Sequence, residues 1–158
     1  TSMKAATVKQ IKDELNDRSP KELLEFCLRL SKFKKENKEL LTYLLFEAAD
    51  EESFIHSVKS EMDEQFENVN RKNFYYAKKG IRKILTSVKK HNRYSQNKET
   101  EVDLLIYFCQ SLKTFSPSIR RSTTMMNLYN RQIEMIRKKI EKLHEDLQYD
   151  YGQALEDL

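Results

Sequence analysis

The order of apolar and polar positions along the chain predicts a protein built of helices. Apolar residues recur every three or four positions through most of the sequence, which is the spacing of one face of an α-helix. Glycine and proline number only 2 each. The sequence also lacks Asn-Gly and Asp-Gly, the pairs that favour tight β-hairpins. We therefore predict an all-α fold.

Three helices are predicted in the N-terminal third of the chain. The first covers about residues 4–17. Ser19, followed by Pro20 and Glu22, has the order of a capping box and predicts a second helix to about residue 35. Asn37 is expected to cap a third helix. Apolar residues surround most of its girth, which predicts a central position; they are Leu40, Leu41, Tyr43, Leu44, Leu45 and Phe46.

Four more helices are predicted in the rest of the chain. Asp50 is expected to cap one whose apolar residues recur every four positions, namely Phe54, Val58, Met62 and Phe66. Helices over about 72–91 and 99–114 follow, separated by a polar loop. A long C-terminal helix is then predicted over about 117–149. The expected fold is thus about seven helices in a single domain over residues 3–158, with helix hairpins over about 4–114.

Two stretches of the chain share a pattern that predicts a structural repeat. Leu30–Tyr43 and Leu85–Tyr107 both read Leu, Ser or Thr, a Lys-Lys pair, a polar gap and Leu-Leu-x-Tyr. In each, a helix ending in lysines precedes a helix opening with leucines, which predicts antiparallel hairpins over Leu30–Phe46 and Leu85–Cys109. Stacked hairpins give an α-solenoid-like body. An irregular helical bundle is the alternative, and the sequence leaves both open.

A resemblance to known proteins is carried by the 28 residues "SPKELLEFCLRLSKFKKENKELLTYLLF", 19–46. This stretch resembles the opening of a group of small bacterial α-helical proteins, and more distantly the helix pairs of HEAT and armadillo repeats. The resemblance implies a helix-pair fold. It implies no activity, so no functional residue is carried over from it.

Charge is distributed unevenly between two neighbouring helices. Residues 71–98 contain ten basic residues and no acidic one, whereas 47–68 contain eight acidic residues and one lysine. A nucleic-acid-binding face is one interpretation, since lysines can contact phosphates and interleaved tyrosines can stack on bases. Its core would be Lys78, Lys79, Arg82, Lys83, Lys89 and Lys90. In the alternative, which we favour here, the two helices are neighbours that partly neutralise each other, leaving an ordinary solvated face.

The end of the chain has the spacing of a coiled-coil seam. Alternating steps of three and four residues lead to the seam residues Ile133, Ile136, Ile140, Leu143 and Leu147. A helix over about 117–149 would be about 50 Å long, so it would cross the whole domain or project from it. We expect the seam to be covered either by the first helix or by a second copy of the chain, and we favour the second copy.

Sequence motifs for catalysis are scarce. Glu141 and His144 form one E-x-x-H pair, but di-iron bundles need a second pair and two further carboxylates. Cys27 and Cys109 lie in apolar stripes, which predicts two buried thiols in a reducing cytoplasm and no disulfide. No apolar run approaches the ~20 residues of a membrane span, and the N-terminus lacks a signal-peptide pattern. We therefore predict no catalytic residue, no cofactor and no metal.

These patterns predict a cytoplasmic, non-enzymatic helical interaction module. Its partner would be another protein or a second copy of itself, and no membrane. A nucleic-acid-binding protein that uses the basic helix over 71–98 is the alternative. A metalloenzyme built on Glu141 and His144 ranks behind both.

Overall fold

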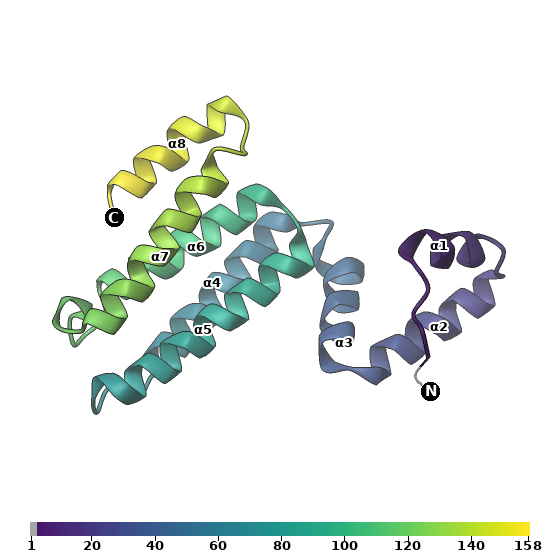
Figure 1. The fold of residues 1–158 in the computed structure, drawn as a ribbon, viewed down its shortest axis with the longest axis horizontal. Helices are drawn as coiled ribbons and strands as arrows, with labels where there is room; N and C mark the ends of the chain where they lie inside the picture. The colour runs from purple at the N-terminus through teal and green to yellow at the C-terminus, as the bar shows by residue number, and fades with distance from the viewer. Residues whose placement is uncertain (1–2) are drawn as a thin grey trace. The chain divides into compact units, whose positions relative to one another are not determined.

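The fold is all-helical, as predicted. The structure is a computed structural model that describes residues 3–158, and this range contains eight α-helices, one π-helical turn, one 3-10 turn and no strand (Figure 1). The chain divides into two compact units, one ending at Leu45 and the other beginning at Phe46. The single domain expected over 3–158 stays a prediction. The first unit holds the short helices, and the second holds the hydrophobic core.

The N-terminal unit contains α1 (Val8–Asn16), α2 (Pro20–Phe33) and α3 (Lys35–Thr42), followed by a π-helical turn over Tyr43–Glu47. Both halves of the predicted capping box form at the start of α2: Glu22 N donates to Ser19 Oγ at 3.2 Å, and Ser19 N donates to Glu22 Oε1 at 3.3 Å. The start of α1 has a capping box too.

The role predicted for Asn37 differs from the observed one. α3 begins at Lys35, after an extended Lys34, and it has no side-chain cap. Asn37 instead donates from Nδ2 to the carbonyl of Leu30, at 2.8 Å. That carbonyl lies in the last turn of α2, where no backbone partner remains. Asn37 therefore closes the end of one helix from inside the next.

The N-terminal unit lacks a core of its own. None of the residues in α1, α2 and α3 is buried. The prediction that the third helix is central is therefore wrong: of its apolar residues only Tyr43, in the π-helical turn, is buried. The physical reason is size, because a unit of three short helices has too few elements to enclose an apolar face.

The C-terminal unit is built around one apolar helix. It comprises α4 (Glu51–Glu67), α5 (Phe74–Ser95), α6 (Lys98–Lys113), α7 (Thr123–Ile140) and α8 (Glu145–Glu156), with a 3-10 turn over Ile119–Arg121. α6 contacts α4, α5, α7 and α8, and the helices lie side by side (Figure 1). Eight residues of α6 are buried: Thr100, Val102, Leu104, Leu105, Ile106, Phe108, Cys109 and Leu112.

α4 and α5 pack closely because of two features of their sequences. The predicted stripe of α4 is buried as a whole: Phe54, Val58, Met62 and Phe66. Gly80 of α5 faces Val69, and a Cβ at this glycine would lie 3.2 Å from a Val69 methyl carbon. The missing side chain therefore lets the loop after α4 pack directly against α5.

The prediction of one long C-terminal helix over 117–149 is wrong, because the chain turns back within this range. α7 starts only at Thr123, capped by Ser122, and ends at Ile140. α8 starts at Glu145 with His144 as its N-cap. Gln148 holds the turn by donating from Nε2 to the carbonyls of Leu143 at 2.8 Å and Glu141 at 3.2 Å. An apolar residue buried in the turn, Leu143, anchors it further.

The hairpins predicted from the repeat are present as helix contacts only. α2 contacts α3, and α5 contacts α6. Their stacking into a solenoid stays a prediction. Within residues 3–158 no helix combines the length and hydropathy that a membrane-spanning helix needs.

The burial of α7 leads to a stability prediction. Ile136 has no exposed surface, so replacing it with alanine leaves a cavity in the C-terminal unit. We expect Ile136→Ala to lower the free energy of unfolding by about 2–5 kcal/mol, measured by urea denaturation followed by circular dichroism. The exposed Lys138 on the same helix is the matched control. Lys138→Ala should change the free energy of unfolding by less than about 0.5 kcal/mol. Equal unfolding midpoints for the two variants would contradict this placement of α7.

Candidate functional site

The predicted seam residues lie inside the C-terminal unit. Ile136, Ile140 and Leu143 are buried, and Ile133 and Leu147 are half-buried. Their covering helices are α6 and α8, which both contact α7. The seam therefore does not project, and neither of the two covers expected from the sequence, the first helix or a second copy, is needed to bury it.

The predicted basic residues lie in two rows along α5. Lys78, Arg82 and Lys89 follow one another at helical spacing, and Arg93 extends this first row by one more turn. Lys79, Lys83 and Lys90 form a second row beside it. Among the six predicted residues, Lys79, Arg82 and Lys83 are exposed and the others are half-buried. The two ends of the predicted basic stretch lie outside this helix, because α5 spans only Phe74–Ser95.

The side chain of Arg71 makes contacts that stabilise the fold. Its guanidinium donates to the carbonyl of Phe66 at 3.0 Å and to the carbonyl of Ser116, and it lies 4.0 Å above the centre of the Phe115 ring. It thus joins the end of α4 to the loop after α6. Arg71 is therefore not part of the free basic surface.

The acidic helix α4 does not neutralise the first basic row. α4 and α5 are neighbours, as the sequence suggested, but the α5 side chains that meet α4 carboxylates include His91, with Nε2 3.7 Å from Glu61 Oε2, and Ser95, which donates to Glu51. His91 lies roughly 160° around the helix from both Lys89 and Arg93, at about 100° per residue. Over residues 3–158, Lys78, Arg82, Lys83 and Lys89 have no ion-pair partner.

Hydroxyl groups of α6 donate hydrogen bonds to other carboxylates of α4. Thr100 Oγ1 donates to Glu51 at 2.7 Å, and the Tyr107 hydroxyl donates to Asp63 at 2.6 Å. The hydrogen bond to Asp63 raises the pKa of Tyr107 to about 12, so the phenol stays neutral and keeps donating. These bonds connect α4 to α6.

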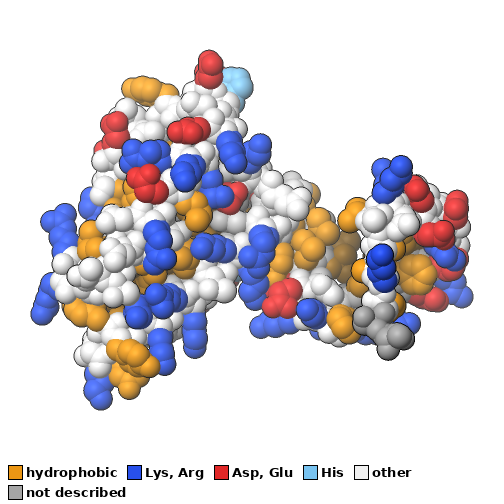
Figure 2. Space-filling view, viewed as in Figure 1, with side chains coloured by type: hydrophobic (Ala, Val, Ile, Leu, Met, Phe, Trp, Pro, Cys, Tyr) orange, Lys and Arg blue, Asp and Glu red, His pale blue; other side chains and the backbone are white. Residues whose placement is uncertain are grey.

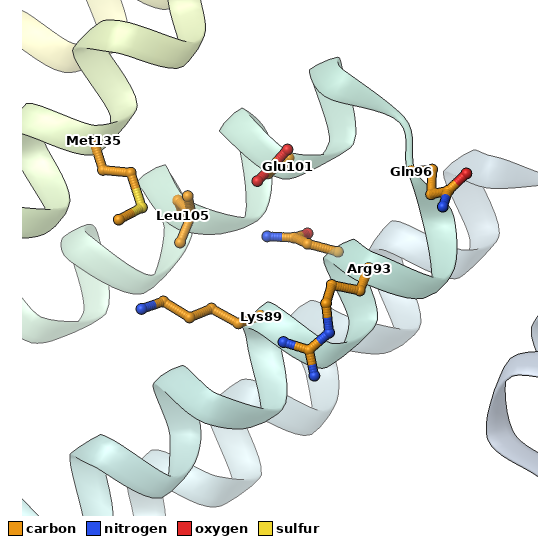
Figure 3. A pocket seen from close by; sticks show the side chains of 7 residues that line it. Lys89, Arg93, Gln96, Glu101, Leu105 and Met135 are labelled. Atoms are coloured by element: carbon orange, nitrogen blue, oxygen red, sulfur yellow. The ribbon is translucent and has the colours of Figure 1, made fainter. Parts of the chain in front are cut away.

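A pocket opens where the first basic row meets α6 and α7. It has a volume of about 520 Å³ and is lined by Lys89, Asn92, Arg93, Gln96, Glu101, Leu105 and Met135. In Figure 3 Lys89 extends from α5 toward Leu105 and Met135. Lys and Arg side chains also gather over α5 and α7 on the face seen in Figure 2. The pocket is within the size range of ligand sites.

Asn92 is a pocket residue that sequence reasoning missed. Residues 92–100 were predicted as a polar loop, but α5 continues to Ser95, and Asn92 is only 7% exposed. The signal was present, because the buried positions Ile81, Leu85 and Val88 lead to Asn92 by one more helical step. The asparagine is polar, so the apolar pattern alone ended the helix too early.

Two features shape the pocket around Asn92. Lys139 of α7 pairs with Glu101 of α6, so part of the carboxylate's charge is neutralised from within the fold. Gln96 ends α5 in the left-handed conformation, with φ of 54°, where glycine is the usual residue. The pocket therefore combines two cations, one carboxylate already paired with Lys139, one buried amide and an apolar wall.

A second surface of interest belongs to the N-terminal unit. Apolar residues of α2 span roughly 220° of the helix at about 100° per residue, far wider than α3 can cover. We give the name N-terminal apolar surface to the exposed apolar residues of α2, α3 and the π-helical turn: Leu24, Phe26, Leu28, Leu30, Phe33, Leu40, Leu44 and Leu45. Between α2 and α3 lies a groove of about 170 Å³, lined mainly by leucines. In Figure 2 apolar side chains are visible on this unit among charged ones.

The structure separates the residues considered for chemistry. His144 caps α8, accepting from Asp146 N at 3.3 Å, and Glu141 lies just beyond α7, so the two no longer share a helix face. Over residues 3–158 no cluster of three or more His, Cys, Asp or Glu side chains could hold a metal ion. The cysteines are both free, but Cys27 is exposed, contrary to the prediction that both are buried.

Comparisons of this chain with protein-family models, curated proteins and solved structures find no match. The resemblance of residues 19–46 to bacterial helix-pair proteins stays a prediction.

The two cysteines differ in a way that thiol labelling can measure. Burial raises the pKa of the Cys109 thiol to about 12, so at pH 8 it is both inaccessible and protonated. We expect one thiol per folded chain to react with a thiol reagent at pH 8, and two after unfolding in urea. Cys27→Ser should remove the fast reaction only. Rapid labelling of folded Cys27→Ser protein would contradict the burial of α6.

Proposed function

We propose that the protein is a helical interaction module that self-associates through the N-terminal apolar surface. The observation that supports this most directly is an apolar surface on a unit without a core. Leu30 is 60% exposed and Phe33 is 76% exposed. Water-exposed apolar residues of this size, gathered on one small unit, are typical of contact surfaces.

The area of this surface fits a second copy. At roughly 150 Å² for each large apolar side chain, the exposed fractions leave on the order of 600 Å² of apolar surface. A standard interface buries about 800 Å² on each partner, of which a little over half is apolar. One N-terminal unit therefore offers about the apolar area that one side of a stable dimer needs.

Charge also favours a self-complementary contact. The polar face of α2 carries both signs at its margin: Lys21, Glu22, Glu25, Arg29 and Lys32. Two copies related by a two-fold axis place the same patch against itself, so residues of opposite sign can pair across the interface. A different protein with an amphipathic helix is the other possible occupant, and the experiment below separates the two.

Self-association predicts a concentration-dependent mass. We expect the full chain to be a dimer or larger by light scattering at about 100 μM, and the double variant Leu30→Glu with Phe33→Glu to be monomeric, because charged residues cannot be buried unpaired in an apolar interface. The control introduces the same residue type on α1, outside the N-terminal apolar surface and its charged margin, as Lys9→Glu with Lys12→Glu at exposed positions, and should keep the higher mass.

A monomeric wild-type chain at that concentration overturns self-association. Equal masses for both double variants overturn the assignment of the contact to this surface. Circular dichroism of each variant shows whether the helices remain formed.

We place this function in the cytoplasm. The exposed Cys27 and the buried Cys109 are both free thiols, and free thiols are typical of reducing compartments.

A second candidate function is nucleic-acid binding, and the open first basic row of α5 favours it. Lys78, Arg82, Lys89 and Arg93 extend over about 22 Å of helix, and none of them has an ion-pair partner over residues 3–158. Such a row can contact several successive phosphates and release their counterions.

The salt dependence of binding tests this candidate. Arg82→Ala should weaken binding to a fluorescent oligonucleotide for all sequences alike, and reduce the slope of log K against log salt by about one. The exposed Lys38 of the N-terminal unit is the control, and Lys38→Ala should leave the slope unchanged. No binding at 50 mM salt, by fluorescence anisotropy with DNA and RNA, would remove this function.

A further inference from the structure

The pocket between α5, α6 and α7 lies in line with the first basic row. Lys89 and Arg93 belong to both, because they end the row and line the pocket. Leu105 and Met135 supply an apolar wall from the two other helices. A ligand here can therefore contact cations on one side and apolar side chains on the other.

Asn92 gives the pocket an unusual polar group. Its side chain is 7% exposed, and over residues 3–158 no group donates a hydrogen bond to its Oδ1. Buried polar atoms are almost always hydrogen-bonded, and each exception calls for an explanation. Rotation about χ2, which is a soft torsion in asparagine, turns this oxygen toward the pocket, where a ligand N–H can donate to it.

These groups together match the chemistry of a nucleobase attached to a phosphate. A side-chain amide can donate and accept at once, as it does with the N6 and N7 positions of adenine. The thioether of Met135 suits contact with an aromatic ring. Lys89 and Arg93 stand where the phosphate of the same nucleotide needs a positive charge.

We propose that this pocket binds one unpaired base of a single-stranded nucleic acid whose phosphates follow the first basic row. The base donates an N–H to Asn92 Oδ1 and lies against Leu105 and Met135. This proposal rests on the second candidate function and adds to it a base-specific contact.

The length of the basic row favours a strand over a free nucleotide. Arg82 and Lys78 lie further along α5, away from the pocket, where a single nucleotide cannot reach. Beyond them Tyr75 is 58% exposed, with Lys79 Nζ 4.7 Å from its ring centre. An exposed aromatic ring beside a cation is a stacking platform for a further base. A duplex does not fit, because its bases are paired and their edges are not free to enter a pocket.

The test measures base preference and salt dependence separately in the full chain. Fluorescence anisotropy is recorded with twelve-residue oligomers of adenine, cytosine, and uracil or thymine, as RNA and DNA, with a duplex, and with adenosine monophosphate as competitor. We expect one base to bind about tenfold more tightly than the others, and the duplex and the mononucleotide to bind weakly.

Asn92→Leu is the decisive variant, because leucine has a similar volume and suits a buried position. It should abolish the base preference and leave the salt slope unchanged, whereas Arg82→Ala should weaken all oligomers and keep the preference. Thermal unfolding of Asn92→Leu at or above the wild-type midpoint shows that the fold is intact. Asn92→Gln is a second variant with the amide retained but displaced, and it should keep less than the full preference.

The outcomes distinguish this inference from the second candidate function. Salt-dependent binding without base preference, or an unchanged preference in Asn92→Leu, overturns the proposal that the pocket binds a base. Phosphate binding by the first basic row is unaffected by that result. If adenosine monophosphate competes as well as the oligomer, the proposal that the ligand is a strand is overturned. Absence of binding to every oligomer at 50 mM salt overturns both.

Discussion

The burial of α6 is the constraint on which the C-terminal unit depends. Eight of its residues are buried, and a helix that is apolar on several sides is stable only when other helices enclose it. α4, α5, α7 and α8 all contact it. This requirement explains why the chain turns back after Ile140. One long straight helix would leave part of α6 uncovered, whereas α8, packed against both α6 and α7, covers it. Leu143 and Gln148 hold the turn, so the former coiled-coil seam becomes part of the core.

The same enclosure decides where the charged surface lies. α5 buries Ile81, Leu85 and Val88 in the core, and its flank with His91 meets α4. The remaining surface of α5 is where the lysines and arginines stand, and their first row borders α6 and α7 rather than the acidic helix. A buried asparagine at the end of that row is costly in an apolar core without a partner. Its position in a pocket, between two cations and an apolar wall, is the most specific chemical feature of the fold.

The N-terminal unit shows the opposite balance. Its helices are well specified locally, with capping boxes at Thr7 and Ser19 and with Asn37 closing the end of α2. Yet none of α1, α2 and α3 contributes a buried residue. Local hydrogen bonds fix where helices start and stop, but burial of apolar area supplies most of the stabilisation of short helices. The N-terminal unit therefore keeps an uncovered apolar surface, whereas the C-terminal unit encloses its own core.

Local sequence patterns were enough to predict the helical class and the helix starts at Pro20 and Glu51, because apolar spacing and capping are local properties. They also predicted the basic character of α5 and the apolar stripe of α4. Only the tertiary structure decided which apolar faces meet. Ile136 and Leu30 both lie in apolar stripes of their helices, yet one has no exposed surface and the other is 60% exposed. The local patterns also missed the turn at 141–144 and the burial of Asn92, since burial depends on residues far apart in the chain, which no local pattern contains.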